Sequence, residues 1–346
     1  MSEAIETRQL FTKSPFNFEI RKKMLQPGLD DVLVKVKACG ICGTDYHFAK
    51  DGAGDFIPLG HEVSGIVEKV GDNVTRFKPG DNVVAENHTL CGVCEKCKDG
   101  LSVHCRNIKT YQGVEAGLAD YILLHHTMLN KFTGLNFTEA SMAEPLTVAL
   151  DIVEATDIPL NSSVAIFGAG TIGLLILQVV KLLGASDILL VDKSLDDKSS
   201  RYKLELGKKL GASDIAGYDS PDFYDVIKDK YPDGLDRVII TSPPNTLEGA
   251  INISKFGGVI GLIGVVFGKD RLVSFDMNEF HFKRLELRCI HAIPNLRFPM
   301  ALDLIKRKKI DVNSLITHKV NFEDYEQAFN IFKDAQAESV KIVVIV

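Results

Sequence analysis

The sequence lacks any apolar segment long enough to cross a bilayer. Its longest apolar stretch, residues 172–180, is interrupted by Gly173 and Gln178, whereas a spanning helix needs about 20 apolar residues. The first ten residues, MSEAIETRQL, contain acidic side chains and no apolar core, so no secretory signal is expected there. Internal repeats and low-complexity segments are also absent. These absences predict a cytoplasmic protein that does not bind membranes.

An excess of positive charge is missing as well. The formal net charge is -6 and the pI is near 5.9, which gives no support for nucleic acid as a partner. The 45% hydrophobic and 25% charged content is that of an ordinary globular protein. A length of 346 residues favours two domains over one. The expected partner is therefore a small-molecule substrate.

The seven cysteines do not suit a disulfide framework. Their number is odd, they are clustered, and no export signal accompanies them. Clustered thiols in a reducing compartment more often bind metal. Cys39 and Cys289 stand apart from the metal-type motifs, and we expect both to be packed as small hydrophobic side chains.

Four of these cysteines have the spacing of a closed metal site. Cys91, Cys94 and Cys97 are separated by two residues each, and Cys105 follows. Four thiolates complete a tetrahedral zinc shell and leave no position for substrate, so this zinc is expected to be structural. An iron–sulfur cluster is the alternative, but nothing else in the sequence indicates electron transfer.

The chain changes character near residue 141. Before it lie short β-type runs at 32–36, 62–70 and 82–85, with a turn at 78–81. After it, strands predicted at 163–167, 188–191, 237–241, 258–264 and 285–291 alternate with helices at 171–183 and 198–210. The tail reads as helices at 299–308 and 322–335 and a strand at 341–346. This order predicts an α/β protein, with a β-rich domain followed by a doubly wound parallel sheet.

A glycine-rich turn follows the first of these strands. Gly168, Gly170 and Gly173 fit the pattern G-x-G-x-x-G, with Thr171 and Ile172 between them. The pattern alone is weak, but here it joins a predicted strand to a predicted helix. The glycines let the backbone approach a pyrophosphate, and the helix N-terminus supplies N–H donors. A solvated turn without a nucleotide is the alternative.

Asp192 lies at the predicted end of the second strand of this unit, where a carboxylate can accept hydrogen bonds from the adenosine ribose. A 2′-phosphate at that point would meet the same negative charge, so NAD is favoured over NADP. Lys193 is adjacent and would soften the repulsion.

A second metal site is expected near residues 42–62. A catalytic zinc needs about three protein ligands and an exchangeable position. Cys42 offers a thiolate, His61 an imidazole nitrogen and Glu62 a carboxylate. Each residue alone is a weak signal.

Taken together, these segments resemble the zinc-containing medium-chain alcohol dehydrogenases. The matching motifs follow one another in order along the chain: GICGTDYH, GHEVSGIVEKVG, KPGD, CGVCEKC with its later cysteine, ADY, AEPL and GAGTIG. The resemblance implies a GroES-like catalytic domain, residues 1–145 with 295–346, and a Rossmann domain, residues 146–294. The structural zinc lobe would occupy about 86–110. It further implies two zinc ions and one NAD per chain, and a homotetramer or homodimer built through the Rossmann sheets, to which the 258–264 and 285–291 strands would contribute.

The same resemblance assigns roles around the catalytic zinc. Cys42 and His61 look like ligands, and Glu62 like a ligand in some members and a nearby group in others. Thr44 matches the hydroxyl that hydrogen-bonds the substrate oxygen, and His47 a histidine that relays the proton to solvent. Glu144, in the sequence Glu-Pro-Leu, stands where classical alcohol dehydrogenases have a cysteine ligand. This form is similar to sorbitol and related polyol dehydrogenases, where Glu144 would bind zinc directly or through its water.

The expected reaction is the NAD-dependent oxidation of a secondary alcohol to a ketone. A polyol is the expected substrate type. A threonine or diol dehydrogenase is the alternative, because the residues before the cysteine lobe, including His88, resemble threonine dehydrogenases. A non-catalytic zinc- and nucleotide-binding protein is the alternative of another class. The pocket walls are expected to draw on Phe48, Tyr111 and residues 288–297. A phosphorylated substrate stays open, with basic candidates Lys109, Arg284, Arg288 and Arg297.

Overall fold

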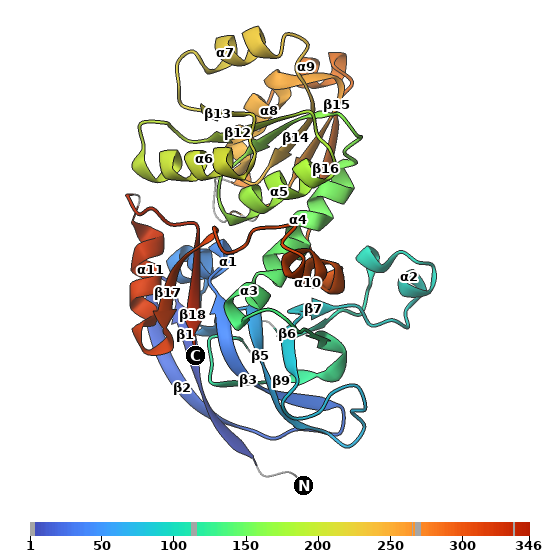
Figure 1. Ribbon diagram of the computed structural model, residues 1–346, viewed down its shortest axis with the longest axis vertical. Coiled ribbons are helices and arrows are strands. Elements are labelled where there is room, and N and C mark those ends of the chain that lie inside the picture. Colours follow the sequence, from blue (N-terminus) through green and yellow to red (C-terminus); the bar gives the residue numbers. More distant parts are fainter. Residues whose placement is uncertain (1–3, 112–115, 265, 267–270, 335) are drawn as a thin grey trace.

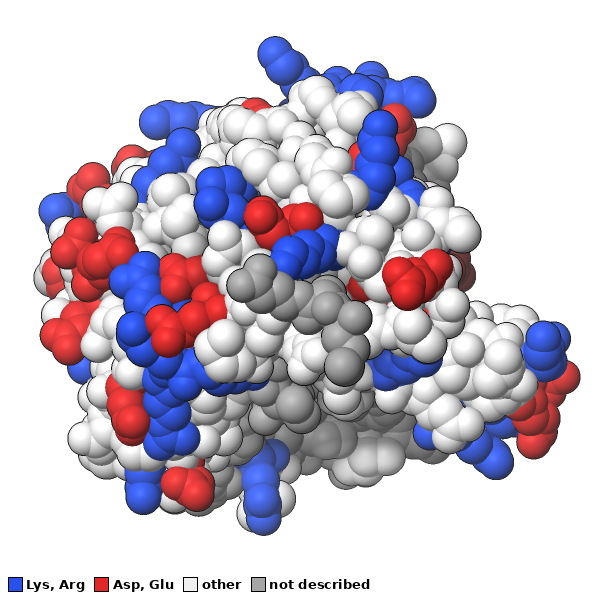
Figure 2. Space-filling view, turned by 90° about the horizontal axis from the view of Figure 1, so that it is seen from below, with Lys and Arg blue, Asp and Glu red and all other residues white. Residues whose placement is uncertain are grey.

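The computed structural model describes residues 4–111, 116–264, 266, 271–334 and 336–346. A β-rich part carries both chain termini, and an α/β part lies at the opposite end (Figure 1). No helix of the described residues is long and apolar enough to span a bilayer. On the face shown in Figure 2, basic and acidic side chains are interspersed rather than gathered by sign.

The β-rich part is organised around β3 (Asp31–Gly40). On one side β3 pairs with β5 (Glu62–Val70), which is followed by β6 (Asn82–Ala85) and β10 (Leu129–Lys131). The other side of β3 receives β9 (Tyr121–His125) and the last strand, β18 (Lys341–Ile345), which pairs with β17 (Ile316–Asn321). The strands expected at 62–70 and 82–85 are confirmed, and the one at 32–36 is longer than expected.

Smaller elements surround this sheet. A three-stranded sheet joins β2 (Asn17–Leu25), β1 (Ile5–Lys13) and β4 (Ile57–Pro58), and a two-stranded one joins β7 (His88–Thr89) and β8 (Lys109–Thr110). The helices here are short: α1 (Gly43–His47), a π-helical turn (Phe48–Gly52), α2 (Glu95–Lys98) and α3 (Phe137–Ser141). The short β-type runs expected before residue 141 indicate no long helices there, in agreement with these lengths.

The α/β part is a six-stranded parallel sheet in the order β13-β12-β11-β14-β15-β16. Its strands are β11 (Ser163–Phe167), β12 (Asp187–Asp192), β13 (Asp214–Gly217), β14 (Leu235–Ile240), β15 (Ser254–Leu262) and β16 (Glu286–Cys289). Alternate residues of β11 enter two cores. Val164 and Ile166 pack in the core that contains α5 (Thr171–Leu182) and α6 (Lys198–Leu210), and Ala165 and Phe167 pack in the other. Burial on both faces explains the continuous apolar runs. The predicted doubly wound sheet is confirmed.

The second face of this sheet is covered by α7 (Phe223–Lys230), α8 (Leu247–Ile253) and α9 (Met277–Phe282). These helices and β13 were not predicted. The tail helices expected at 299–308 and 322–335 are α10 (Phe298–Lys306) and α11 (Tyr325–Lys333), the latter preceded by a 3-10 turn at Phe322–Asp324.

Helix α4 (Ala143–Thr156) was also missed, and it is the element that joins the two parts. Pro145 is tolerated because it stands in the first turn, where its missing N–H has no intrahelical partner. Most of α4 is buried, including Glu144 and Thr147, so its sequence shows no clear polar stripe. The domain limit expected at residue 145 falls inside this helix. The division into 1–145 with 295–346 and 146–294 therefore stays a proposal, which the pairing of β18 with β3 supports.

One cysteine prediction was wrong. Cys39 is fully buried in β3, as expected, but Cys289 is exposed. It ends β16, the outermost strand of the six-stranded sheet, where nothing in the described chain covers it.

Candidate metal centres and dinucleotide-binding loop

The first candidate metal centre lies where β3 and β5 meet. Cys42 precedes α1, His61 precedes β5, and Glu62 is the first residue of β5, paired with Gly40 of β3. One ligand atom from each of Cys42, His61 and Glu62 lies within 4.8 Å of the others. His61 and Glu62 are buried. Sheet pairing thus brings together three of the predicted ligands.

Asp45 lies next to His61, and sequence reasoning assigned it no role. Its Oδ1 lies 3.5 Å from His61 Nδ1, and the carboxylate accepts the backbone N–H groups of Cys42 (2.9 Å) and Gly60 (3.0 Å). A carboxylate behind the imidazole fixes the ring and leaves its other nitrogen for a metal. Although burial alone would raise the pKa of Asp45, the His61 charge and these N–H groups lower it. The signal that could have revealed Asp45 is its position between Thr44 and His47 in the GICGTDYH motif.

Lys341 is a second unpredicted member of the site. From β18 it donates to Glu62 Oε1 and to the carbonyl oxygen of Ile41 at 2.9 Å. The two charged side chains are 3% and 1% exposed. Glu62 Oε2 is buried and has no hydrogen-bond partner among the residues that the structure describes. Lys341 thus neutralises one oxygen of this carboxylate, and the other oxygen is left unpaired within them. An orphaned buried oxygen beside a cysteine and a histidine fits a divalent cation.

Glu144 lies beside this group but is not one of its three members. It stands in the first turn of α4, and its Oε1 accepts the carboxamide N–H groups of Asn87 (3.2 Å) and Asn295 (3.3 Å). Burial raises its pKa to about 7, with Glu62 adding to the shift and His61 and Lys341 opposing it.

The other predicted catalytic residues lie on α1. The Cys42 thiol contacts Thr44 Oγ1 at 3.7 Å. His47 ends α1 half-buried, and burial lowers its pKa, which keeps the ring neutral near pH 7. His88 is buried against Asn295, and its pKa falls to about 4 because of burial and the charges of His61 and His291. His88 is therefore no ordinary exposed loop histidine.

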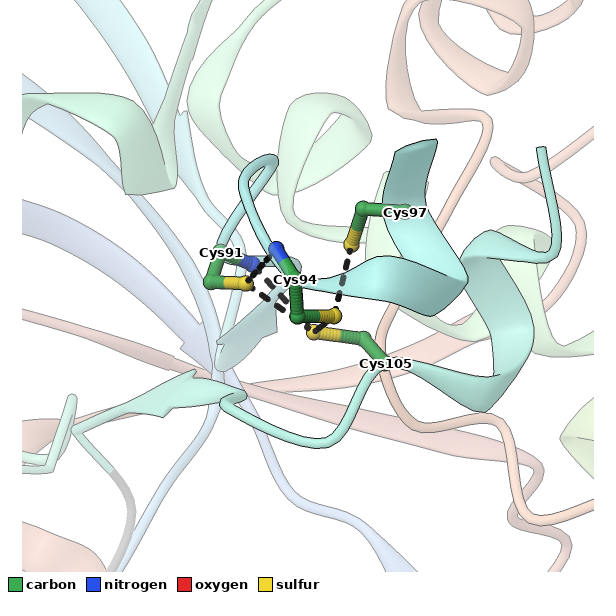
Figure 3. A group of neighbouring side chains, drawn as sticks. All are labelled: Cys91, Cys94, Cys97 and Cys105. Atoms are coloured by element: carbon green, nitrogen blue, oxygen red, sulfur yellow. Dashed lines mark hydrogen bonds between the residues drawn. The ribbon is translucent and has the colours of Figure 1, made fainter. Parts of the chain in front are cut away.

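The four cysteines of the lobe converge on a common centre (Figure 3). Sulfur–sulfur distances are 3.6 Å for Cys94–Cys97, 3.6 Å for Cys91–Cys105 and 3.9 Å for Cys94–Cys105. A tetrahedron with Zn–S bonds of about 2.3 Å has edges of about 3.8 Å. All four are free thiols. The spacing suits a single ion, whereas an iron–sulfur cluster must also hold iron and sulfide between its thiolates.

The glycine-rich loop joins β11 to α5. Gly168 has φ +103°, and a Cβ on Gly173 would lie 1.8 Å from the Gly168 carbonyl oxygen, so both positions require glycine. Gly170 caps α5 and has open space beside it. The backbone N–H groups of the helix start are thus left accessible to an anion.

Two further residues shape this loop. Asp192 ends β12, and its carboxylate accepts the N–H groups of Ala169 (3.1 Å) and Lys193 (2.7 Å). Thr171 donates its hydroxyl to the carbonyl of Val340 at 2.8 Å, which ties the loop to the residue before Lys341. Ile172 packs against the adjoining core, and Lys193 is exposed.

The basic residues considered for a phosphate group already have partners. Arg288 binds Glu286 and the carbonyl of Ala155. Arg297 pairs with Asp151 and Glu154. Lys109 contacts the His125 ring, and Arg284 lies over the Phe256 ring. They are not brought together at the metal centre. Of the expected pocket residues, Tyr111 is buried with its hydroxyl on the His61 carbonyl at 3.1 Å, and Phe48 is half-buried.

Comparison with known proteins agrees with this arrangement. Residues 28–134 match the family model for the alcohol dehydrogenase GroES-like domain, and 171–307 match the zinc-binding dehydrogenase model. The chain is 32% identical to D-xylulose reductase A of Aspergillus oryzae, over 88% of this chain and 86% of that protein. It is 31% identical to L-threonine 3-dehydrogenase of Bacillus velezensis, over 91% of each chain.

A solved structure shares the whole fold. A zinc-binding dehydrogenase of Sinorhizobium meliloti bound to NADP superposes with a TM-score of 0.86, at 28% identity, over 99% of this chain and 100% of that one. The chain belongs to the zinc-containing medium-chain alcohol dehydrogenase family. As expected for this family, it combines a GroES-like part with a Rossmann-type sheet.

Within this dehydrogenase, the Lys341–Glu62 pair is open to a direct test. Lys341→Met should leave the buried Glu62 carboxylate without its cation, which costs about 3–5 kcal/mol of unfolding free energy. Lys22→Met breaks a pair whose side chains are 64% and 55% exposed and should cost about 0–1 kcal/mol. Denaturant titration of the metal-free protein measures both. Equal losses in the two variants would contradict a dominant role for the buried pair.

Proposed function

We propose that this chain is a zinc-dependent dehydrogenase that oxidises a secondary alcohol of the polyol class to a ketone, with NAD as acceptor. The observation that carries the proposal is the convergence of Cys42, His61 and Glu62 in one group, in which His61 and Glu62 are buried. Three protein ligands leave a coordination position for substrate, as catalytic zinc requires. The neighbouring Glu144 supplies a further carboxylate.

Two zinc ions per chain follow from the two groups. Cys42, His61 and Glu62 form an open set, with Glu144 beside it, and the four lobe cysteines form a closed set. The unused Glu62 Oε2 supports Glu62 as the direct third ligand. Free thiolates in both groups need reducing surroundings, which supports a cytoplasmic location.

The residues of the chain would divide the work as follows. When bound, zinc supplies a Lewis acid that lowers the pKa of the alcohol oxygen, and NAD accepts the hydride. Thr44 accepts the hydroxyl proton and the neutral His47 relays it to solvent. Asp45 holds His61 in orientation. The loop at Gly168, Gly170 and Gly173 receives the dinucleotide phosphates, and Asp192 the ribose hydroxyls.

Two buried polar atoms favour a substrate with several hydroxyl groups. Asn87 Oδ1 and His88 Nδ1 have no hydrogen-bond partner among the described residues. The Asn87 side chain donates to Glu144, and the backbone N–H of His88 donates to Asn295, which also binds Glu144. Because an unpaired buried polar atom is costly, additional substrate hydroxyls would satisfy them. Threonine is the second candidate, since a threonine dehydrogenase is among the relatives and His88 is buried here.

A phosphorylated polyol is the less favoured substrate. Binding a phosphate needs cationic groups that are free to converge on it. Arg288 and Arg297 are instead held by carboxylates. We therefore assign a neutral polyol to the site.

A panel of alcohols tests the proposal. NADH formation should be fastest with polyols and slower with threonine, butanediol and phosphorylated polyols, and a chelator should abolish it. Cys42→Ser should lower kcat/KM more than about 100-fold, because even groups behind the ligands contribute 10–100-fold. The control, Cys289→Ser, changes an exposed thiol and should leave the rate unchanged.

Three outcomes would count against the assignment. Undiminished oxidation by folded, metal-depleted Cys42→Ser protein would remove zinc from the reaction. Turnover of threonine alone would replace the polyol assignment. No NADH from any alcohol, in protein with both sites loaded, would favour a non-catalytic zinc- and nucleotide-binding protein.

Cofactor preference depends on one charge. Asp192→Asn keeps an acceptor for the Ala169 N–H but removes the negative charge. We expect kcat/KM with NADP to rise about tenfold relative to NAD, because a 2′-phosphate no longer meets a carboxylate. Asp196→Asn, at an exposed neighbouring position, is the matched control. A ratio that does not move in Asp192→Asn would show that this carboxylate does not select NAD.

We also propose a homodimer, or a tetramer built from it, through the edge of the six-stranded sheet. Within the described chain, no strand pairs with the outer edge of β16, and Phe256, Phe282 and Leu287 beside it are 65%, 70% and 39% exposed. An open edge flanked by apolar side chains is suited to pairing with a second copy.

Sedimentation measures this assembly. The wild type should sediment as a multiple of 38.1 kDa, and Phe282→Glu with Leu287→Glu should shift it toward the monomer. Leu160→Glu, at an 80% exposed position outside this edge, should not. A wild-type monomer at micromolar concentration would refute the proposal.

A further inference from the structure

Glu144 is held by two neutral carboxamides rather than by a cation. We propose that Asn87 and Asn295 are positioning residues, which turn the Glu144 carboxylate toward the metal centre without placing a positive charge against it. This inference rests on the proposed function, because it assigns Glu144 a task toward a bound divalent ion.

Asn295 is fixed by three hydrogen bonds. Its backbone N–H donates to the His88 carbonyl at 2.9 Å, and its Oδ1 accepts the His88 N–H at 3.3 Å. The side chain is 4% exposed. Because Oδ1 is committed to His88, the Nδ2 group can only turn the other way, where it meets Glu144 Oε1 at 3.3 Å.

Asn87 completes the clamp from the residue next to His88. It is 5% exposed, and its Nδ2 donates to the same Glu144 Oε1 at 3.2 Å. Two donors on one oxygen fix the plane of the carboxylate and leave Oε2 outside the clamp. Among the charged groups, His61, Glu62 and Lys341 of the metal centre have the largest effects on the pKa of Glu144.

The two carboxylates of the site are therefore held in opposite ways. Lys341 places a full positive charge next to Glu62. The two amides donate hydrogen bonds to Glu144 but carry no charge. The clamp thus orients Glu144 without a competing cation on the oxygen that the amides hold. Asn295 lies between β16 and α10, in the segment that leaves the six-stranded sheet, so the orientation of Glu144 also depends on where this segment lies.

The test uses holoenzyme with zinc in the cysteine lobe and Co²⁺ in the second site. In the substrate-free protein, Asn87→Leu removes the donor to Glu144 and no other side-chain hydrogen bond of the described residues, because Asn87 Oδ1 has no partner among them. We expect Co²⁺ affinity, measured by chelator competition, to fall about tenfold, with a shift of the visible Co²⁺ absorption. Asn295→Ser should act in the same direction. Asn313→Leu, which breaks an exposed bond to Glu139, should change neither quantity.

A second background decides whether the effect passes through Glu144. In Glu144→Gln protein, Asn87→Leu should change Co²⁺ affinity less than twofold, because the group that it positions has lost its charge. An undiminished tenfold effect there, or no effect in the wild-type background, overturns the inference. Unchanged lobe zinc and melting temperature confirm folding, and Asn295→Ser gives the same comparison should Asn87→Leu not fold.

The proposed function fails separately. If the wild type binds no Co²⁺ outside the lobe, both proposals fall. If it binds Co²⁺ and oxidises alcohols while the asparagine variants match it, only the clamp is refuted.

Discussion

The buried ion pair between Lys341 and Glu62 is the contact on which the arrangement depends. It joins the final strand to the first residue of β5, and neither charge reaches solvent. An isolated buried charge is far more costly than a buried pair, so the candidate metal centre requires strand β18. The pair also explains Gly40, because a Cβ there would lie 2.0 Å from Glu62 Oε2 and 2.8 Å from Lys341 Cε.

The same strand links the metal centre to the dinucleotide loop. Val340 accepts the Thr171 hydroxyl, and the next residue, Lys341, reaches Glu62. Helix α4 makes a second connection, since Glu144 lies in its first turn and its later turns pack in the core that includes α5. Asn295 makes a third connection, because it donates to Glu144 and lies in the segment that leaves the six-stranded sheet. The cofactor loop and the candidate metal ligands are therefore parts of one connected framework, although they come from different sheets.

Patterns in the sequence predicted those features of the structure that residues close together in the chain determine. The cysteine spacing of the lobe, the strand–glycine–helix unit at 163–182 and the buried strands β5 and β6 all depend on residues close together in the chain. The partners of Glu62 and Glu144 could not be found in this way. In the sequence, Lys341 is simply a lysine before an apolar run. Asn87 and Asn295 carry no signal of their own, because they become neighbours only when β7 contacts the segment at residue 295 in the folded chain. Helix α4 was missed because its burial on most sides removes the helical periodicity.

The two groups of candidate ligands also differ in when they can form as the chain leaves the ribosome. The lobe draws all its thiols from neighbouring positions, and α2 buries no side chain of its own, so an ion can organise it before the Rossmann sheet is synthesised. The other group stays incomplete until Asn295 and strand β18, which carries Lys341, have also been synthesised, because both follow the strands of the six-stranded sheet in the chain. During synthesis, the four-cysteine scaffold can therefore be completed before the group at Cys42, His61 and Glu62 has all its supporting residues.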